Sequence, residues 1–226
     1  MGSVPVFSAP SFARDTSRIP QQEKLSSYLN DLQSNRNPNV RARAASYLGM
    51  LKNPAALPAL NKSLTSDVSE QVRINSANAI GRINQKASVK QLLQAIRPNR
   101  GKTDVQIAII RSIGDMGDNS KEYVPVISKF LRSPNPYIRE AVAEALWKIR
   151  DPRSTKVMNA LLKQEKELVV QLSLMKYIAD FKSPESIPLL EKIIADPKTH
   201  IDVRSLARDA LDKLETIDQL QDASGA

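Results

Sequence analysis

Residues 39–51 read NVRARAASYLGML, and the pattern of this stretch decides the fold. It opens with the β-branched residue Val40, called here the anchor, and apolar residues follow at the fourth, eighth and eleventh positions after it. That spacing places four side chains on one face of a helix. The stretch therefore predicts an amphipathic helix with a single apolar stripe.

The same pattern returns five more times, at intervals of 32 or 33 residues. The six anchors are Val40, Val72, Val105, Ile138, Val170 and Val203. The residues at the eighth position are Leu48, Ile80, Ile113, Leu146, Ile178 and Leu211. Shorter apolar segments of helical period precede each anchor. Each unit is therefore predicted to be a helix pair, A then B, with the anchor in helix B.

A single helix pair cannot bury its own apolar stripe, so the units must stack on one another. We therefore predict an all-α fold, an α-solenoid or curved superhelix of six two-helix repeats, forming one domain over residues 21–217. Residues 1–20 and 218–226 lack the periodicity needed to bury a face. For these we expect a disordered leader and a disordered tail.

The stretch at residues 39–49, followed by PAALPAL at 54–60, resembles the HEAT-like repeat of phycobilisome-lyase-type proteins. The resemblance implies an armadillo-like HEAT-repeat scaffold for protein–protein interaction, or an auxiliary protein of bilin lyase type. The family's glycine at the ninth position is present in units one to three but not later, the six residues being Gly49, Gly81, Gly114, Trp147, Ala179 and Asp212. The arginine after the anchor is Gln106 in unit three and Gln171 in unit five. An Asp–Arg ladder of the family's kind is therefore expected to be interrupted.

The composition excludes several classes of enzyme. The chain has no cysteine and one histidine, so thiol nucleophiles, Cys-based zinc sites and multi-histidine metal centres are impossible. No glycine-rich phosphate loop is present. We predict that the protein is not an enzyme, with no catalytic residue, no metal and no cofactor.

No stretch approaches the roughly 18 consecutive apolar residues that a membrane span needs. We expect a cytoplasmic monomer, or a periplasmic or secreted protein if a leader has been removed. The net charge of +9 is uneven, with 22 Lys and Arg against 11 Asp and Glu in residues 1–150, and 11 against 13 in residues 151–226. This asymmetry indicates nucleic acid, another polyanion or an acidic surface as a possible partner, although it also serves solubility alone.

The predicted turns from helix A to helix B lie on one edge, beside the N-termini of the B helices, where backbone N–H groups favour anions. The candidate anion-binding edge consists of Arg36, Arg41, Arg73, Arg97, Arg100, Lys102, Arg132 and Arg139. The alternative is that the arginines after the anchors bond nearby carbonyls or pair with Asp67, Asp104 or Asp202. In that case the edge has a structural role.

The exposed face of the B helices, expected to be concave, is the predicted surface for a protein partner. In units three to six the sixth and tenth positions carry opposite charges, which predicts ion pairs within each helix and a solvated face. The candidate partner-binding residues are Tyr47, Met50, Asn78, Arg82, Arg111 and Trp147. Trp147 replaces a glycine, so it either packs between repeats or anchors a partner. We favour a protein partner on this face over a polyanion on the basic edge.

Overall fold

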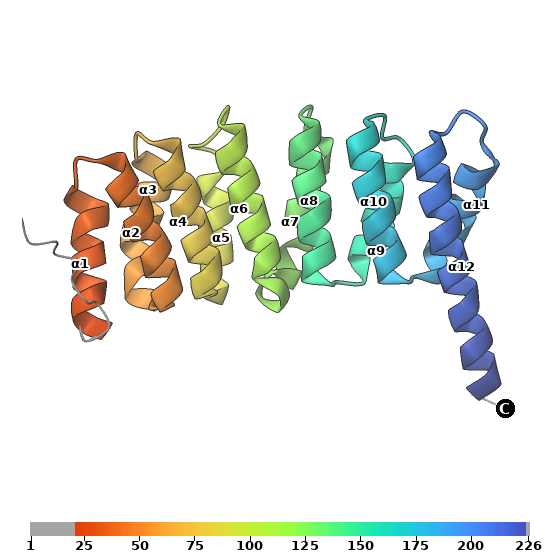
Figure 1. Ribbon diagram of the computed structural model, residues 1–226, viewed down its shortest axis with the longest axis horizontal. Coiled ribbons are helices and arrows are strands. Elements are labelled where there is room, and N and C mark those ends of the chain that lie inside the picture. Colours follow the sequence, from red (N-terminus) through yellow and green to blue (C-terminus); the bar gives the residue numbers. More distant parts are fainter. Residues whose placement is uncertain (1–20, 225–226) are drawn as a thin grey trace, which may run out of the picture.

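The computed structural model describes residues 21–224, with side chains for residues 21–214. The helices form two layers along an elongated rod, with the B helices in one layer, the A helices of units two to six behind them, and the first A helix at the N-terminal end beside the first B helix (Figure 1). No strand occurs between residues 21 and 224. The predicted all-α solenoid of six helix pairs is confirmed. The predicted leader at residues 1–20 lies outside the described residues.

The B helices are regular and begin two residues before their anchors. They are α2 (Pro38–Leu51), α4 (Glu70–Ile83), α6 (Thr103–Asp115), α8 (Pro136–Ile149), α10 (Leu168–Phe181) and α12 (Ile201–Ser224). Two of them start on an asparagine cap followed by proline. The side chains of Asn37 and Asn135 accept hydrogen bonds from the Asn39 and Tyr137 amides, both at 2.9 Å. These caps satisfy donors that a helix start leaves unpaired.

Apart from the first, the A helices are shorter and less regular than the B helices. They are α1 (Gln21–Ser34), α3 (Leu57–Ser66), α5 (Lys86–Ala95), α7 (Val124–Ile127), α9 (Arg153–Leu162) and α11 (Ile187–Ala195). Short 3-10 helices precede α3 and α11, namely η2 (Pro54–Ala56) and η5 (Pro184–Ser186). In unit four, α7 lies between the 3-10 helices η3 (Gly117–Tyr123) and η4 (Ser128–Arg132). Pro125, the second residue of α7, has no N–H group and cannot donate a backbone hydrogen bond, which is consistent with the short length of α7.

The apolar stripe of the B helices forms the core. None of the anchor, fourth, eighth and eleventh positions is exposed in any unit, and Leu146 is completely buried. The least covered of these positions lie toward the ends of the stack, and Val40 and Leu211 are half-buried. The register predicted from the anchors is therefore confirmed.

In five units the backbone turns left-handed at the twelfth position after the anchor, which ends α2, α4, α8 and α10 and follows the end of α6 by two residues. The residues there are Lys52, Asn84, Gly117, Arg150 and Lys182, with φ between 50° and 56°. Such a residue is a common helix terminator. Helix α12 lacks this stop and continues to Ser224 (Figure 1). It thus runs past residue 217, where the sequence predicted the end of the domain and a disordered tail.

Candidate functional site

The first four B helices meet at three close junctions, where the ninth position of one helix packs against the seventh position of the next. A Cβ added to Gly49 would lie 2.7 Å from the Cα of Ala79, and one added to Gly114 would lie 2.6 Å from the Cα of Ala145. At Gly81 the nearest atom would be the Cβ of Ser112, at 3.0 Å. Only glycine permits so close an approach. Helices α2, α4, α6 and α8 are therefore closely joined along their exposed face.

From α8 onward this glycine is missing. Trp147 stands at the ninth position of unit four, and its ring stacks on Tyr177 of unit five with the ring centroids 5.2 Å apart. Tyr177 occupies the seventh position, where units two to four have the small residues Ala79, Ser112 and Ala145 and unit one has Tyr47. An aromatic pair thus replaces a glycine–alanine contact. At the next junction, between α10 and α12, the ninth position carries Ala179 instead of glycine. Two stacked rings therefore lie between α8 and α10, where a glycine–alanine contact joins α6 to α8.

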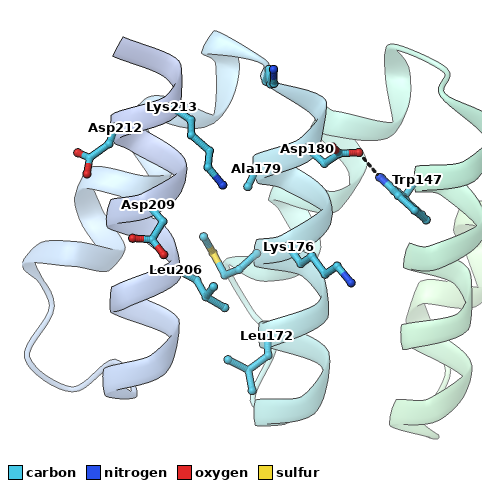
Figure 2. Close-up of a pocket in the computed structure, with 11 residues that line it drawn as sticks. Trp147, Leu172, Lys176, Ala179, Asp180, Leu206, Asp209, Asp212 and Lys213 are labelled. Atoms are coloured by element: carbon cyan, nitrogen blue, oxygen red, sulfur yellow. Dashed lines mark hydrogen bonds between the residues drawn. The ribbon is translucent and has the colours of Figure 1, made fainter. Parts of the chain in front are cut away.

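A groove of about 1020 Å³ opens along these last three B helices. Its lining residues come from α8, from α10 and the residue that ends it, and from α12, as Figure 2 shows. We call it the B-helix groove, and it is lined by Trp147, Leu172, Met175, Lys176, Ala179, Asp180, Lys182, Leu206, Asp209, Asp212 and Lys213. Leu172 and Leu206 are half-buried, so they leave apolar surface open to a partner. Met175, which also lines the groove, is fully buried.

Trp147 is held in a fixed orientation at one wall of the groove. Its indole Nε1 donates a hydrogen bond of 2.6 Å to the Oδ2 of Asp180 (Figure 2). The Arg150 guanidinium binds the same carboxylate and lies 5.2 Å from the centre of the indole ring. The hydrogen bonds from Trp147 and Arg150 lower the pKa of Asp180. The indole is therefore a preorganised apolar surface, and Asp180 is ionised and already bonded.

The charged residues at the rim of the groove are not paired as the sequence predicted. Neither Lys176 and Asp180 nor Asp209 and Lys213 form an ion pair, as far as the described residues show. Of the four predicted pairs within one helix, only Glu144 with Lys148 forms, at 2.8 Å. The prediction of a self-paired face is wrong for units three, five and six.

The other charges on this face bond across repeats. Arg111 binds Glu144 at 2.6 Å and Glu140 at 3.1 Å in the next unit, and Lys148 reaches back to Asp115 at 2.8 Å. These contacts join α6 to α8 above the glycine junction. Arg111 is thus committed to the scaffold and is not a free contact for a partner.

The structure does not bring the predicted partner-binding residues together. Tyr47 stacks on Tyr28 of α1 with the ring centroids 4.9 Å apart, at the N-terminal end of the rod. Met50 is 66% exposed, and Asn78 and Arg82 are also exposed, but none of them lines the B-helix groove. Trp147 alone among the six predicted residues does. The others of the groove, above all Leu172 and Leu206, were missed.

A signal for the missed residues exists in the sequence. Leu206 stands at the third position of unit six, where the earlier units have Arg43, Asn75, Ala108, Ala141 and Ser173. A long apolar residue at that position, next to a junction without glycine, indicates an open apolar surface. The missing glycine alone does not predict an open surface, because a larger side chain at that position can also fill the space between two helices. The two features are needed together.

Four of the eight residues of the predicted anion-binding edge are bonded to other residues of the chain. Arg41 donates two hydrogen bonds of 2.8 Å to the Asp67 carboxylate, and Arg139 donates two of 2.7 Å to Glu165. Arg73 binds Asn99 at 2.9 Å, and Lys102 forms an ion pair of 2.6 Å with Glu70. These bonds agree with the alternative of a structural role for the arginines after the anchors, Arg41, Arg73 and Arg139, and Lys102 is bonded within the chain as well. Four others are exposed and form no side-chain bond with described residues, namely Arg36, Arg97, Arg100 and Arg132.

These bonds form a partial ladder between successive repeats. Burial disfavours the charge of Asp67, but the hydrogen bonds from Arg41 and the Ser69 amide outweigh it and lower the pKa of Asp67. The same balance, with Arg139 as the main donor, lowers the pKa of Glu165. Gln106 makes no such bond in unit three, and Gln171 reaches only the Glu165 carbonyl oxygen, at 2.7 Å. The ladder is thus interrupted in units three and five, as the sequence predicted.

Within residues 21–224, no group of three or more His, Cys, Asp or Glu side chains is placed to hold a metal ion. Within the same range, none of the helices has the length and apolar character needed to cross a membrane.

Comparison with known proteins gives a consistent result for the fold. The family model of HEAT repeats matches residues 25–101 and 89–176. The search of curated proteins returned no match. Among solved structures, an archaeal HEAT-like repeats protein from Thermococcus onnurineus NA1 is 14% identical, with a TM-score of 0.51, over 87% of this chain and 93% of that one.

Two other solved structures are also similar. An engineered protein is 18% identical with a TM-score of 0.50, over 84% of this chain and 58% of that one. The complex of CpcE and CpcF of phycocyanin lyase from Nostoc sp. PCC7120 is 15% identical with a TM-score of 0.43, over 92% of this chain and 99% of that one. At these identities the likeness concerns the fold alone.

Proposed function

The chain belongs to the HEAT-repeat family, and from this premise we propose that it is a non-catalytic scaffold or adaptor that holds a protein partner in the B-helix groove. Stacked repeats of this kind offer extended surfaces to other proteins. The groove lies on the predicted B-helix face, but in units four to six and not in the first two units. The expected contact surface therefore lies in units four to six.

The observation that carries the proposal is the open apolar surface around an oriented tryptophan. Leu172 and Leu206 are half-buried and line the groove, and Trp147 is fixed by Asp180 and Arg150. Rigid tryptophan side chains beside apolar pockets are frequent anchors in protein interfaces. A groove with an apolar floor and a charged rim has the composition of such an interface.

The residues that line the groove are poorly suited to catalysis. The eleven residues that line it include no His, Cys, Ser or Thr. Asp180 accepts bonds from Trp147 and Arg150, and its lowered pKa makes it a poor general acid. The polar groups of the groove are suited to recognition.

Photo-crosslinking from two positions tests the proposal. A photoreactive phenylalanine analogue replaces Lys176 at the rim of the groove or, as the matched control, the exposed Lys90 of α5. We expect a discrete protein to be crosslinked from position 176 and not from position 90, and Leu206→Asp to abolish it. Equal labelling from the two positions, or none from position 176, contradicts the proposal.

A second candidate function is the binding of nucleic acid or another polyanion at the basic edge. It is supported by Arg97, Arg100 and Arg132, which are exposed on the turns of adjacent units and form no side-chain bond with described residues. Each phosphate that such residues neutralise makes the affinity fall with salt. The auxiliary role in bilin attachment stays a prediction from the sequence resemblance.

A further inference from the structure

We propose that the occupant of the B-helix groove is an amphipathic α-helix whose apolar face is flanked by acidic side chains. This inference rests on the proposed function, because it names the partner of the same groove. Three features of the groove carry it: its length, the spacing of its walls and the imbalance of its charges.

The length of the groove matches about three turns of a helix. Its wall on α10 runs from Leu172 to Lys182, which is roughly 15 Å at the rise of an α-helix. A helix about 10 Å across and of that length has a volume of roughly 1200 Å³. This is close to the 1020 Å³ of the groove. A helix of about three turns therefore has about the volume of the groove.

The lining residues recur at helical spacing on both walls. On α10 they are Leu172, Met175, Lys176 and Ala179, and on α12 they are Leu206, Asp209 and Lys213. Residues three and four apart form ridges along a helix. Two such ridges side by side, with a channel between them, form the receiving half of a helix-in-groove contact. Leu172 and Leu206 lie at one end of the channel, and Asp180 and Lys213 lie at the other (Figure 2).

The charges that line the groove are out of balance. Lys176, Lys182 and Lys213 form no ion pair with described residues. Asp180 is bonded to Arg150 and Trp147. Asp212 also has an interaction partner. This leaves one unpaired lining carboxylate, that of Asp209, against three lysines.

An apolar occupant without charges would leave these lysines partly desolvated and unpaired, which is unfavourable. An occupant with basic flanks would be repelled. Glutamate or aspartate beside the apolar face of the occupant would pair with Lys176 and Lys213 at the rim. The groove is therefore complementary to an acidic amphipathic helix.

Trp147 supplies the readout, because it is the only tryptophan of the chain and stands in the groove wall. Three tryptophan-free synthetic peptides of equal length are titrated into the full chain while the emission of Trp147 is recorded. The first is an amphipathic helix with Glu flanks and the second has the same apolar face with Lys flanks. The third has the composition of the first in an order without an apolar face.

We expect the Glu-flanked peptide to bind at least tenfold more tightly than the Lys-flanked one and to shift the emission. In the double variant Lys176→Glu with Lys213→Glu the order of the two should reverse. The matched control, Lys90→Glu with Lys156→Glu on exposed sites of the A helices, makes the same change in net charge and should keep the wild-type order.

The outcomes separate this inference from the function on which it rests. If both amphipathic peptides bind equally and Leu206→Asp abolishes both, the acidic preference is wrong while the groove remains a docking site. Equal binding of the peptide without an apolar face shows that the lysines attract any polyanion and overturns the proposal. If no peptide binds, a helical occupant is excluded, and crosslinking from position 176 still decides whether another protein binds there.

Discussion

The junctions from α2 to α8 and those from α8 to α12 use the same repeat but differ at one position. In the first region glycine lets each B helix touch the next, so the exposed face is closed by backbone contact. In the second region Trp147 and Ala179 stand there, and the face opens into a groove. The apolar stripe that forms the core is the same in both. Binding surface and core are therefore specified by different positions of one repeat.

Truncation of leucine should separate the two regions most strongly. Leu146 is completely buried in the core, whereas Leu172 is half-buried in the groove. We expect Leu146→Ala to lower the free energy of unfolding by about 2–5 kcal/mol because it leaves a cavity. Leu172→Ala should lower it by about 1 kcal/mol or less, since the site is already open. Denaturant unfolding of the two variants measures both, and equal losses would contradict the assignment.

A methyl group at the glycine junction should have the next largest effect. Alanine is the better helix former by about 1 kcal/mol, but the Cβ of Gly114→Ala would meet the Ala145 backbone, which cannot yield. We expect a net loss of about 1–3 kcal/mol in the free energy of unfolding. Gly81→Ala should lose less, because its nearest neighbour is the Ser112 side chain at 3.0 Å. The reverse order in equilibrium unfolding would show that the backbones are not in contact.

The ladder between repeats predicts the response to acid. The pKa values of Asp67 and Glu165 are lowered in the folded chain, so their contribution is present above the unfolded pKa and lost as the pH falls through the folded value. We expect stability to fall between about pH 5 and pH 3, by about 1 kcal/mol for each pair. In Asp67→Asn with Glu165→Gln this fall should be smaller. Unfolding curves at several pH values measure it, and an unchanged slope would mean that other carboxylates dominate.

The sequence predicted the core more completely than the surface, for a physical reason. Burial follows a local period, so the positions of Leu48 and Leu146 could be assigned from spacing alone. The groove depends on how far apart two helices lie, and that distance is set by a pair such as Trp147 and Tyr177 in different repeats. Ion pairs such as Arg111 with Glu144 also join different units, whereas sequence spacing suggests only partners within one helix. The end of α12 was missed because its helix has no left-handed stop.

The smallest effects are expected at the basic edge. Reversing Arg97, Arg100 and Arg132 to Glu should change the free energy of unfolding by less than about 0.5 kcal/mol for each residue, because the three are exposed and unpaired. It should also leave crosslinking from position 176 unchanged. Calorimetry and crosslinking check the two statements. Salt-sensitive binding of DNA or RNA by the wild-type chain, lost in this variant, would instead favour the polyanion as partner.

The central claim is that the residue at the ninth position decides whether two B helices close together or leave a groove. The crystal structure of the double variant Trp147→Gly with Tyr177→Ala tests it most directly, because this pair recreates the contact of Gly114 with Ala145. We predict that α8 and α10 approach until their backbones touch, as α6 and α8 do, and that the groove loses its tryptophan wall. An unchanged separation of α8 and α10, with an empty space where the two rings were, would contradict the claim.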